Sequence, residues 1–351
     1  MIKTYNTTKR GQPFTTNGSF GTSNRRTYGP APVIDAFTSP QNWIELQNFT
    51  ASPFVFTAAN TPTSWTLFSG SLPTGLTFNT TGVDMGKITG TISAATAGSY
   101  SITVKANNSN GASDPATLAI TVVAGPPTTN LWGHWKASEA YDNLDGTGTK
   151  VENDGDPVYS LKDLKTSGTM RHYNQGTAAS KPFYKTNIKG TIPSILFDGS
   201  NDLMSCATYP AGTKLTVIAV LKIFSSGGAI LSYFTGIGSE IRLNSSTNLG
   251  WQVSGDNDPK VTNDANVGVL FTTFNDASSV ASWNNGTLDT GTPNKVAFDS
   301  NVLGFTTNDL YANFHLLELI VYHHATDGAL DPTSGDGLSV MTYINAKYNL
   351  W

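Results

Sequence analysis

The stretch "GSYSITVKANNSNGASDPATLAITV", residues 98–122, decides the fold. Apolar side chains occupy every second position near both of its ends: Tyr100, Ile102, Val104, Leu118, Ile120 and Val122. A period of two places these side chains on one face of a strand, and the intervening "NNSNGASDP" is rich in turn-forming residues. The stretch therefore predicts two short antiparallel strands of a β-sandwich.

The residues upstream extend the same pattern. "SLPTGLTFNTTG" (71–82) and "GKITG" (86–90) precede the paired strands, and this order resembles the immunoglobulin-like domains that recur in bacterial surface proteins and phage virion proteins. The resemblance implies an immunoglobulin-like sandwich over residues 34–123 and no catalytic residue. "AGPPTTN" (124–130) then reads as a stiff proline linker, because consecutive prolines cannot continue a sheet.

Composition supports an all-β chain with more than one domain. The 351 residues are 13% charged and include 34 glycines and 17 prolines, as expected for strands joined by many turns. The net charge of −4 gives no reason to expect nucleic acid or a membrane as a partner. The single cysteine, Cys206, excludes an intrachain disulfide. The first residues do not resemble a signal peptide, so we expect synthesis in the cytoplasm, which for a phage protein is that of the host.

Residues 1–33 differ from the rest of the chain because they contain five basic residues and no acid, the first acid being Asp35. The basic residues are Lys3, Lys9, Arg10, Arg25 and Arg26, and scattered among them are the aromatic residues Tyr5, Phe14, Phe20 and Tyr28. The segment has no strand or helix periodicity and should not fold alone. It is either a solvated tail or an extended arm whose aromatic and basic side chains dock on a partner.

Residues 131–351 predict a second, larger sandwich. "LTVIAVLKI" (215–223) is apolar on both faces, as in a strand buried inside a sandwich. Only the end of the chain reads as a helix, with Asp336 as its cap. Its predicted apolar stripe comprises Leu338, Met341, Ile344 or Asn345, and Tyr348.

Several motifs in this segment resemble the concanavalin A-like and laminin G-like domains of lectins, glucanases and phage structural proteins. They are, in order, "DGDPVYSLKDLKTSG" (154–168), "GTAASKPFYKTN" (176–187), "PSILFDGSNDLMS" (193–205) and "LELIVYHH" (317–324). The resemblance implies a jelly-roll sandwich closed by a short C-terminal helix.

Two groups of acids are candidates for chemistry. Asp198 and Asp202 flank a Gly-Ser-Asn turn, and we interpret them as turn acids, with calcium binding and catalysis as the weaker alternatives. Glu152, Asp154 and Asp156 resemble the Glu-x-Asp-x-Glu strand of glycosidases with this jelly roll, but the string ends in Asp rather than Glu. Their string contains Gly155 and runs into Pro157, so it reads as a loop.

Other residues give weaker signals. His323 and His324 are adjacent and should point to opposite faces of a strand, which does not suit one metal ion. Trp251 and Trp283 could stack on sugars but are more typical of a core. We therefore predict no catalytic residue, no metal and no cofactor, with calcium at Asp198 or Asp202 as the weaker alternative.

These features together predict a non-enzymatic structural protein of a bacteriophage virion. We expect a capsid decoration protein or short head fibre, homo-oligomeric on the virion and anchored to the major capsid protein by residues 1–33. A capsid position is favoured over the tail, because no heptads or shaft repeats appear. The alternatives are a carbohydrate-binding tail fibre or host-surface adhesion module and, third, a glycoside hydrolase.

Overall fold

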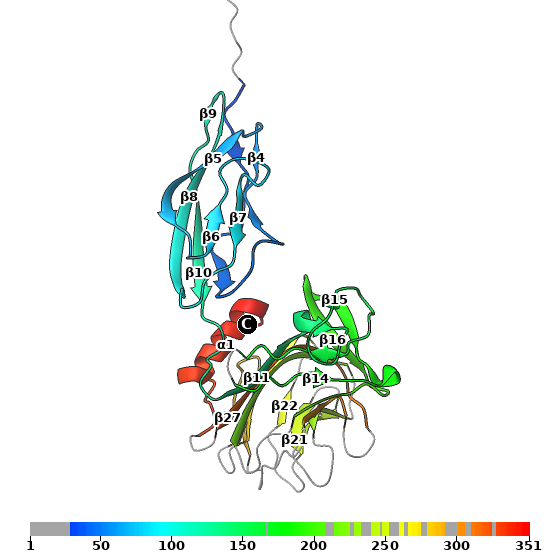
Figure 1. Ribbon diagram of the computed structural model, residues 1–351. Coiled ribbons are helices and arrows are strands. Elements are labelled where there is room, and N and C mark those ends of the chain that lie inside the picture. The colour runs from blue at the N-terminus through cyan, green and yellow to red at the C-terminus, as the bar shows by residue number, and fades with distance from the viewer. Residues whose placement is uncertain are drawn as a thin grey trace, which may run out of the picture.

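The computed structural model describes residues 29–165, 168–207, 214–224, 228–232, 240–245, 248–252, 260–262, 266–274, 279–291, 301–305, 310–324 and 328–351. These residues form sheets grouped into two bodies, one above the other in Figure 1, with one α-helix near their junction. The all-β prediction is confirmed. Within the described ranges no helix is long and apolar enough to cross a membrane.

The first body is the predicted immunoglobulin-like domain. Its larger sheet has the order β2-β10-β8-β5, and β9 pairs with β8. The strands are β2 (Gln41–Ile44), β10 (Ala116–Val123), β8 (Gly98–Asn108), β5 (Ser64–Ser71) and β9 (Gly111–Ala112). The smaller sheets comprise β3 (Phe54–Val55), β7 (Lys87–Gly90) and β6 (Leu76–Phe78), and β1 (Val33–Ile34) with β4 (Ala58–Ala59).

The alternating apolar side chains of residues 98–122 point into the core of this domain. Ile102 and Val104 on β8, and Leu118 and Ile120 on β10, are at most 1% exposed. They pack with an aromatic cluster: Trp43, Phe49, Phe56, Trp65 and Phe78. Burying these apolar surfaces is the main favourable term that holds the sheets of this domain together.

Two glycines of the upstream motifs are required by a close backbone approach. Gly75 and Gly90 have φ of 93° and 112°, a region that other residues rarely adopt. A Cβ atom at Gly75 would lie 2.0 Å from the carbonyl oxygen of Thr91, and one at Gly90 would lie 2.3 Å from the carbonyl oxygen of Gly75. The two motifs therefore meet in space where β6 pairs with β7.

The second body is built from two large sheets. One has the order β15-β16-β27-β18-β23-β24-β25, with β11 paired to β27. Its strands are β15 (Phe183–Lys189), β16 (Ile192–Asp198), β27 (Asn313–His324), β18 (Lys214–Ile223), β23 (Gly268–Phe274), β24 (Ser279–Trp283), β25 (Asp289–Gly291) and β11 (Leu131–Lys136).

The other sheet has the order β12-β13-β14-β17-β26-β19-β20-β21-β22. Its strands are β12 (Ala140–Tyr141), β13 (Ser160–Leu161), β14 (Tyr173–Asn174), β17 (Met204–Cys206), β26 (Asn301–Leu303), β19 (Ala229–Ser232), β20 (Glu240–Ser245), β21 (Asn248–Gln252) and β22 (Lys260–Thr262). Two 3-10 turns, η1 (Ala137–Glu139) and η2 (Ala178–Ser180), complete the elements.

Strand β18 shows why this body has two apolar layers. Val217 and Leu221 belong to the core between the sheets, whereas Ile218 and Val220 belong to a second cluster on the other side of the same sheet. Both sets are fully buried, as the apolar run predicted. Helix α1 (Gly335–Tyr348) covers the second cluster.

The helix corrects two details of the prediction. Ser334, not Asp336, occupies the N-cap position, and Asp336 lies in the first turn. Leu338, expected on the buried stripe, is 46% exposed. Val340 and Tyr343 are buried instead, together with the predicted Met341, Ile344 and Tyr348. The broad surface of the sheet buries a wider stripe of the helix than a single row of apolar residues predicts.

The linker, residues 124–130, is hydrogen-bonded to the second body. The Tyr322 hydroxyl donates to the carbonyl oxygen of Pro127 at 3.0 Å, and the His323 amide donates to that of Asn130 at 2.8 Å. Ile44 and Val123 of the first body pack against the apolar cluster under α1. The boundaries 34–123 and 131–351, and independent folding of the two segments, stay predictions.

Candidate functional site

Asp198 and Asp202 lie at the end of β16 and in the turn that follows it. Asp198 accepts the amide of Ser200 at 2.8 Å, and Asp202 accepts the amide of Asp198 at 2.9 Å. Gly199 has a φ of 79°. Each carboxylate thus holds a backbone amide of the turn, an arrangement that favours the structural interpretation over calcium or catalysis.

Burial perturbs one of these acids. Asp202 is 1% exposed, and its removal from water, together with the charge of Asp198, raises its pKa to about 7, although the Asp198 amide acts in the opposite direction. Because carboxylates bind calcium in their ionised form, a proton on Asp202 would compete with the metal.

The acids with glycosidase-like spacing lie on a surface loop. Asp154 accepts the amide of Thr186 at 2.9 Å and lies 3.3 Å from the Lys185 ammonium group, while Asp156 accepts the Asn153 amide group at 3.0 Å. Glu152 and Asp154 are exposed, and no strand carries the three acids. This loop does not present two carboxylates on the face of a strand as a retaining glycosidase would.

The remaining candidates from the sequence are the tryptophans Trp251 and Trp283 and the cysteine Cys206. Trp283 is 8% exposed and belongs to the core between the sheets, whereas the side chain of Trp251 lies outside the described residues. Burial raises the pKa of Cys206 to about 12, which disfavours a reactive thiolate. Among the described residues, no three His, Cys, Asp or Glu side chains are placed to hold a metal ion.

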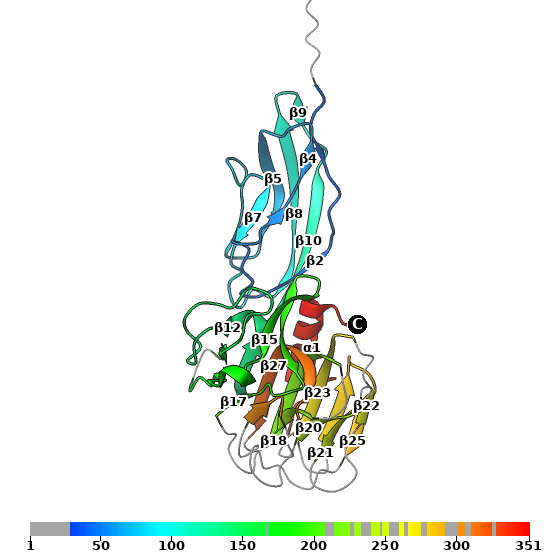
Figure 2. The ribbon, with the colours of Figure 1, turned by 90° about the vertical axis from the view of Figure 1, so that its right-hand side faces the viewer.

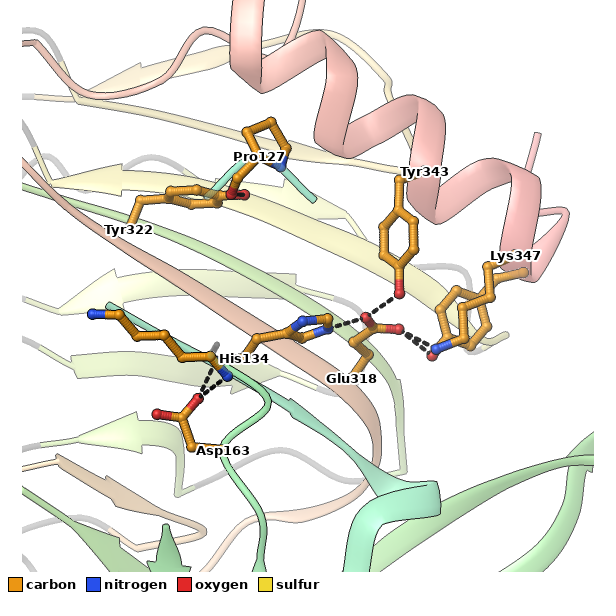
Figure 3. A network of polar contacts seen from close by, with 9 residues as sticks. Pro127, His134, Asp163, Glu318, Tyr322, Tyr343 and Lys347 are labelled. Atoms are coloured by element: carbon orange, nitrogen blue, oxygen red, sulfur yellow. Dashed lines mark hydrogen bonds and ion pairs between the residues drawn. The ribbon is translucent and has the colours of Figure 1, made fainter. Parts of the chain in front are cut away.

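The most concentrated polar cluster was not predicted. Figure 3 shows the Glu318 network, in which one carboxylate accepts from a histidine, two tyrosines and a lysine. The donors are His134 Nε2 at 2.5 Å, Tyr343 Oη at 2.7 Å, Lys347 Nζ at 2.5 Å and Tyr348 Oη at 2.6 Å. Glu318 lies on β27, His134 on β11 and the other three on α1.

The network keeps a fully buried acid ionised. Burial alone would raise the pKa of Glu318, but the Lys347 charge and the His134 hydrogen bond hold it well below its usual value. Burial lowers the pKa of His134 against the opposing influence of Glu318, so the ring donates as a neutral imidazole. Two donors to each oxygen leave the carboxylate with little capacity to act as a base.

A second buried acid, Asp163, supports strand β11, which carries His134. Asp163 accepts the backbone amides of His134 and Lys165 at 3.0 Å and that of Arg171 at 2.9 Å. It therefore fixes the position of β11, which presents His134 to Glu318 (Figure 3). Both buried acids, Glu318 and Asp163, therefore stabilise the fold.

One sequence signal could have identified this network. Glu318 interrupts the apolar run "FHLLELIVY" at a position where a strand buried on both faces should carry an apolar residue. A charged residue there demands a partner, because an unpaired buried charge is very costly. The spacing of Tyr343, Lys347 and Tyr348 on one helix provides the complementary donors.

A groove lies between the two bodies. It encloses about 320 Å³ and is lined on one side by β2 and β10 and on the other by α1 and Trp351. The described residues that line it include no charged side chain. It is a candidate binding site for an uncharged ligand.

The nine residues predicted to dock on a partner, Lys3, Tyr5, Lys9, Arg10, Phe14, Phe20, Arg25, Arg26 and Tyr28, lie outside the described residues. Their docking role stays a prediction.

Comparisons with known proteins support the first body. Residues 31–123 match the family described as "Putative Ig domain". No curated protein matches the chain.

Among solved structures, the chain is similar to a Trypanosoma rangeli sialidase at 10% identity, with a TM-score of 0.38 and coverage of 74% of this chain and 48% of that one. The same enzyme in complex with sialic acid gives 9% identity, a TM-score of 0.34 and coverage of 79% and 52%. The chain thus spans about half the length of these sialidases. Similarities this distant do not bear on the activity of the chain.

Proposed function

We propose that the chain is a non-enzymatic structural protein of a bacteriophage virion, a capsid decoration protein or short head fibre that displays two β-sandwich bodies. Immunoglobulin-like and β-sandwich domains fit an adhesive or structural role. The similar proteins described above are not viral, so the virion assignment rests on the arrangement of the chain and on its sequence.

The observation that carries the proposal is the position of Pro30 and Ala31, near the end of residues 1–33. Asn108 donates to the carbonyl oxygen of Pro30 at 3.2 Å, and Asn60 donates to that of Ala31 at 2.9 Å. These contacts lie at the tip of the immunoglobulin-like domain that points away from the second body (Figure 2). A partner that holds residues 1–28 would therefore have the larger sandwich at the far end.

The charge distribution suggests the chemistry of that partner. Residues 1–33 carry five basic and no acidic residues, whereas the whole chain has a net charge of −4. An acidic surface with apolar grooves, as a capsid lattice could supply, would pair with the basic side chains and bury the aromatic ones. Repeated attachment to such a lattice would make the protein homo-oligomeric on the virion.

The environment of the acids supports a role without catalysis. The carboxylates of Asp163 and Glu318 accept hydrogen bonds that stabilise the fold, and that of Asp154 accepts a backbone amide of a surface loop. The glycoside hydrolase alternative is tested by incubating the chain with β-glucans. Hydrolysis that disappears in Asp154→Asn would overturn the non-enzymatic assignment.

Attachment is tested with virions of the source phage and two variants, one lacking residues 1–33 and one with its five basic residues changed to Gln. The truncated chain should remain folded by circular dichroism but fail to cosediment with virions. The Gln variant should bind more weakly and with less dependence on salt, because the five positive charges, whose attraction to the partner salt would screen, have been removed. Normal occupancy of the truncated chain would show that a sandwich face mediates docking instead.

A further inference from the structure

The groove between the two bodies has the position and size of a ligand site. Its volume of about 320 Å³ matches the lower end of small-molecule sites, which often occur at domain interfaces. Neither body forms it alone, because Asn42 and Thr121 come from the immunoglobulin-like domain and Leu338, Thr342 and Trp351 from the second body. Asn42 and Thr121 are direct neighbours on the paired strands β2 and β10.

The backbone of one aromatic residue that lines the groove, Trp351, is held in place by the side chain of Asn345. After α1, the chain reverses at Asn349, which has a φ of 49°. Asn345 Oδ1 accepts the amides of Leu350 and Trp351 at 2.9 and 3.1 Å, and its Nδ2 donates to the carbonyl oxygen of Trp351 at 3.0 Å. The Trp351 residue is nevertheless 44% exposed. Its backbone is fixed while part of its apolar surface stays available for contact.

The polar groups around the groove are amides and hydroxyls. The side chains of Asn42, Thr121 and Asn285 line it and form no hydrogen bond with other described residues. Amides offer both donors and acceptors, and a hydroxyl can serve as either. A ligand with several hydroxyl groups could pair with all three side chains.

The described side chains that line the groove carry no charge, and this narrows the ligand class. Phosphates and carboxylates are bound in proteins by Arg, Lys or clustered amide donors at helix N-termini, and the groove is lined by none of the basic residues. Leu338, which is 46% exposed, adds apolar surface to the lining of the groove. The occupant should therefore combine hydroxyl groups with an apolar face.

We propose that this groove binds a neutral saccharide unit, with its apolar ring face against Trp351 and its hydroxyls toward Asn42, Thr121 and Asn285. The inference goes beyond the proposed attachment to a virion and does not depend on it. The proposed attachment uses residues 1–33, whereas the described residues that line the groove lie elsewhere in the chain, so either proposal can fail while the other stands.

The test is saturation-transfer NMR on the full chain with the methyl glycosides of glucose, galactose and N-acetylglucosamine, and with glucuronic acid as a charged probe. At least one neutral glycoside should receive saturation, and glucuronic acid should receive less. Trp351→Ala should abolish transfer, and Asn345→Ala should weaken binding about tenfold by releasing the tail that positions Trp351.

Two further variants keep the result interpretable. Asn42→Asp places a charge in the groove without altering a buried residue and should also weaken binding. Phe68→Ala removes an aromatic residue that is 58% exposed on β5 and should leave binding unchanged. The proposal is overturned if no neutral glycoside binds, if glucuronic acid binds as well, or if transfer persists in both Trp351→Ala and Asn42→Asp.

Discussion

Replacing Glu318 with alanine should destabilise the second body more than any change on its surface. The carboxylate is fully buried and accepts four hydrogen bonds. Its removal leaves the Lys347 ammonium group and two tyrosine hydroxyls without their acceptor. Breaking a buried ion pair by removing one partner typically costs about 3 to 5 kcal/mol, so we expect a loss in this range.

The assay is urea unfolding of the full chain, followed by circular dichroism and tryptophan fluorescence. Glu318→Ala should lower the midpoint of the second body's transition. Glu152→Ala, at an exposed acid, should change stability by less than about 0.5 kcal/mol. Combining Glu318→Ala with Lys347→Met should cost less than the sum of the single changes, because the two charges compensate each other.

The pH dependence gives an independent check. The pKa of Glu318 lies well below its unfolded value of 4.5, so its contribution is present above pH 4.5 and is lost as the pH falls through the folded pKa. The difference between the wild type and Glu318→Ala should therefore be largest near neutral pH and shrink below pH 4.5. A loss under about 1 kcal/mol at neutral pH would refute the reasoning, since that is the magnitude of a surface ion pair.

Four further predictions concern other parts of the chain. Asp202→Asn should stabilise the protein at pH 8 by about 1 to 2 kcal/mol and have little effect near pH 4, because the wild-type carboxyl, with a pKa of about 7, must ionise while buried; urea midpoints at both pH values check this. Burial lowers the pKa of His315 to about 4. Between pH 6.5 and 4 the unfolded state therefore binds a proton at this residue that the folded state does not, and the free energy of unfolding should fall by up to about 3 kcal/mol; His315→Gln should remove this dependence on pH. Gly90→Ala should destabilise the first body by at least about 1 kcal/mol in thermal unfolding, while Gly82→Ala, where a Cβ meets no neighbour, should cost less. Segments 34–123 and 131–351, expressed separately, should each unfold cooperatively, and an unstructured first segment would contradict its independence.

The fold was largely predictable because its signals are local. Period-two alternation on β8 and β10 places apolar residues in a core wherever the strands pair, and the apolar run of β18 requires cover on both faces of its sheet. The helix stripe was partly wrong, since Leu338 faces outward. Which flank of a helix is buried depends on the surface it meets, and that surface is formed by strands distant in sequence.

The candidate sites were much less predictable because they depend on distant pairings. Glu318 and His134 are 184 positions apart, and no spacing rule connects them. The groove requires residues from two bodies and a turn at Asn349 that orients the last residues. Asp198 and Asp202 were interpretable from the sequence because both the acids and the amides they accept lie within one turn.

Helix α1 connects the Glu318 network to the groove. Tyr343, Lys347 and Tyr348 on one side of the helix hold the buried carboxylate, while Leu338 and Thr342 on another side line the groove. Loosening the network should therefore disturb the groove without changing any residue that lines it. Changes to exposed lining residues such as Asn42 should alter binding and leave unfolding unchanged. Glu318→Ala should consequently reduce both stability and saccharide binding, whereas Asn42→Asp should reduce binding alone, and this asymmetry separates a ligand site from a packing defect between domains.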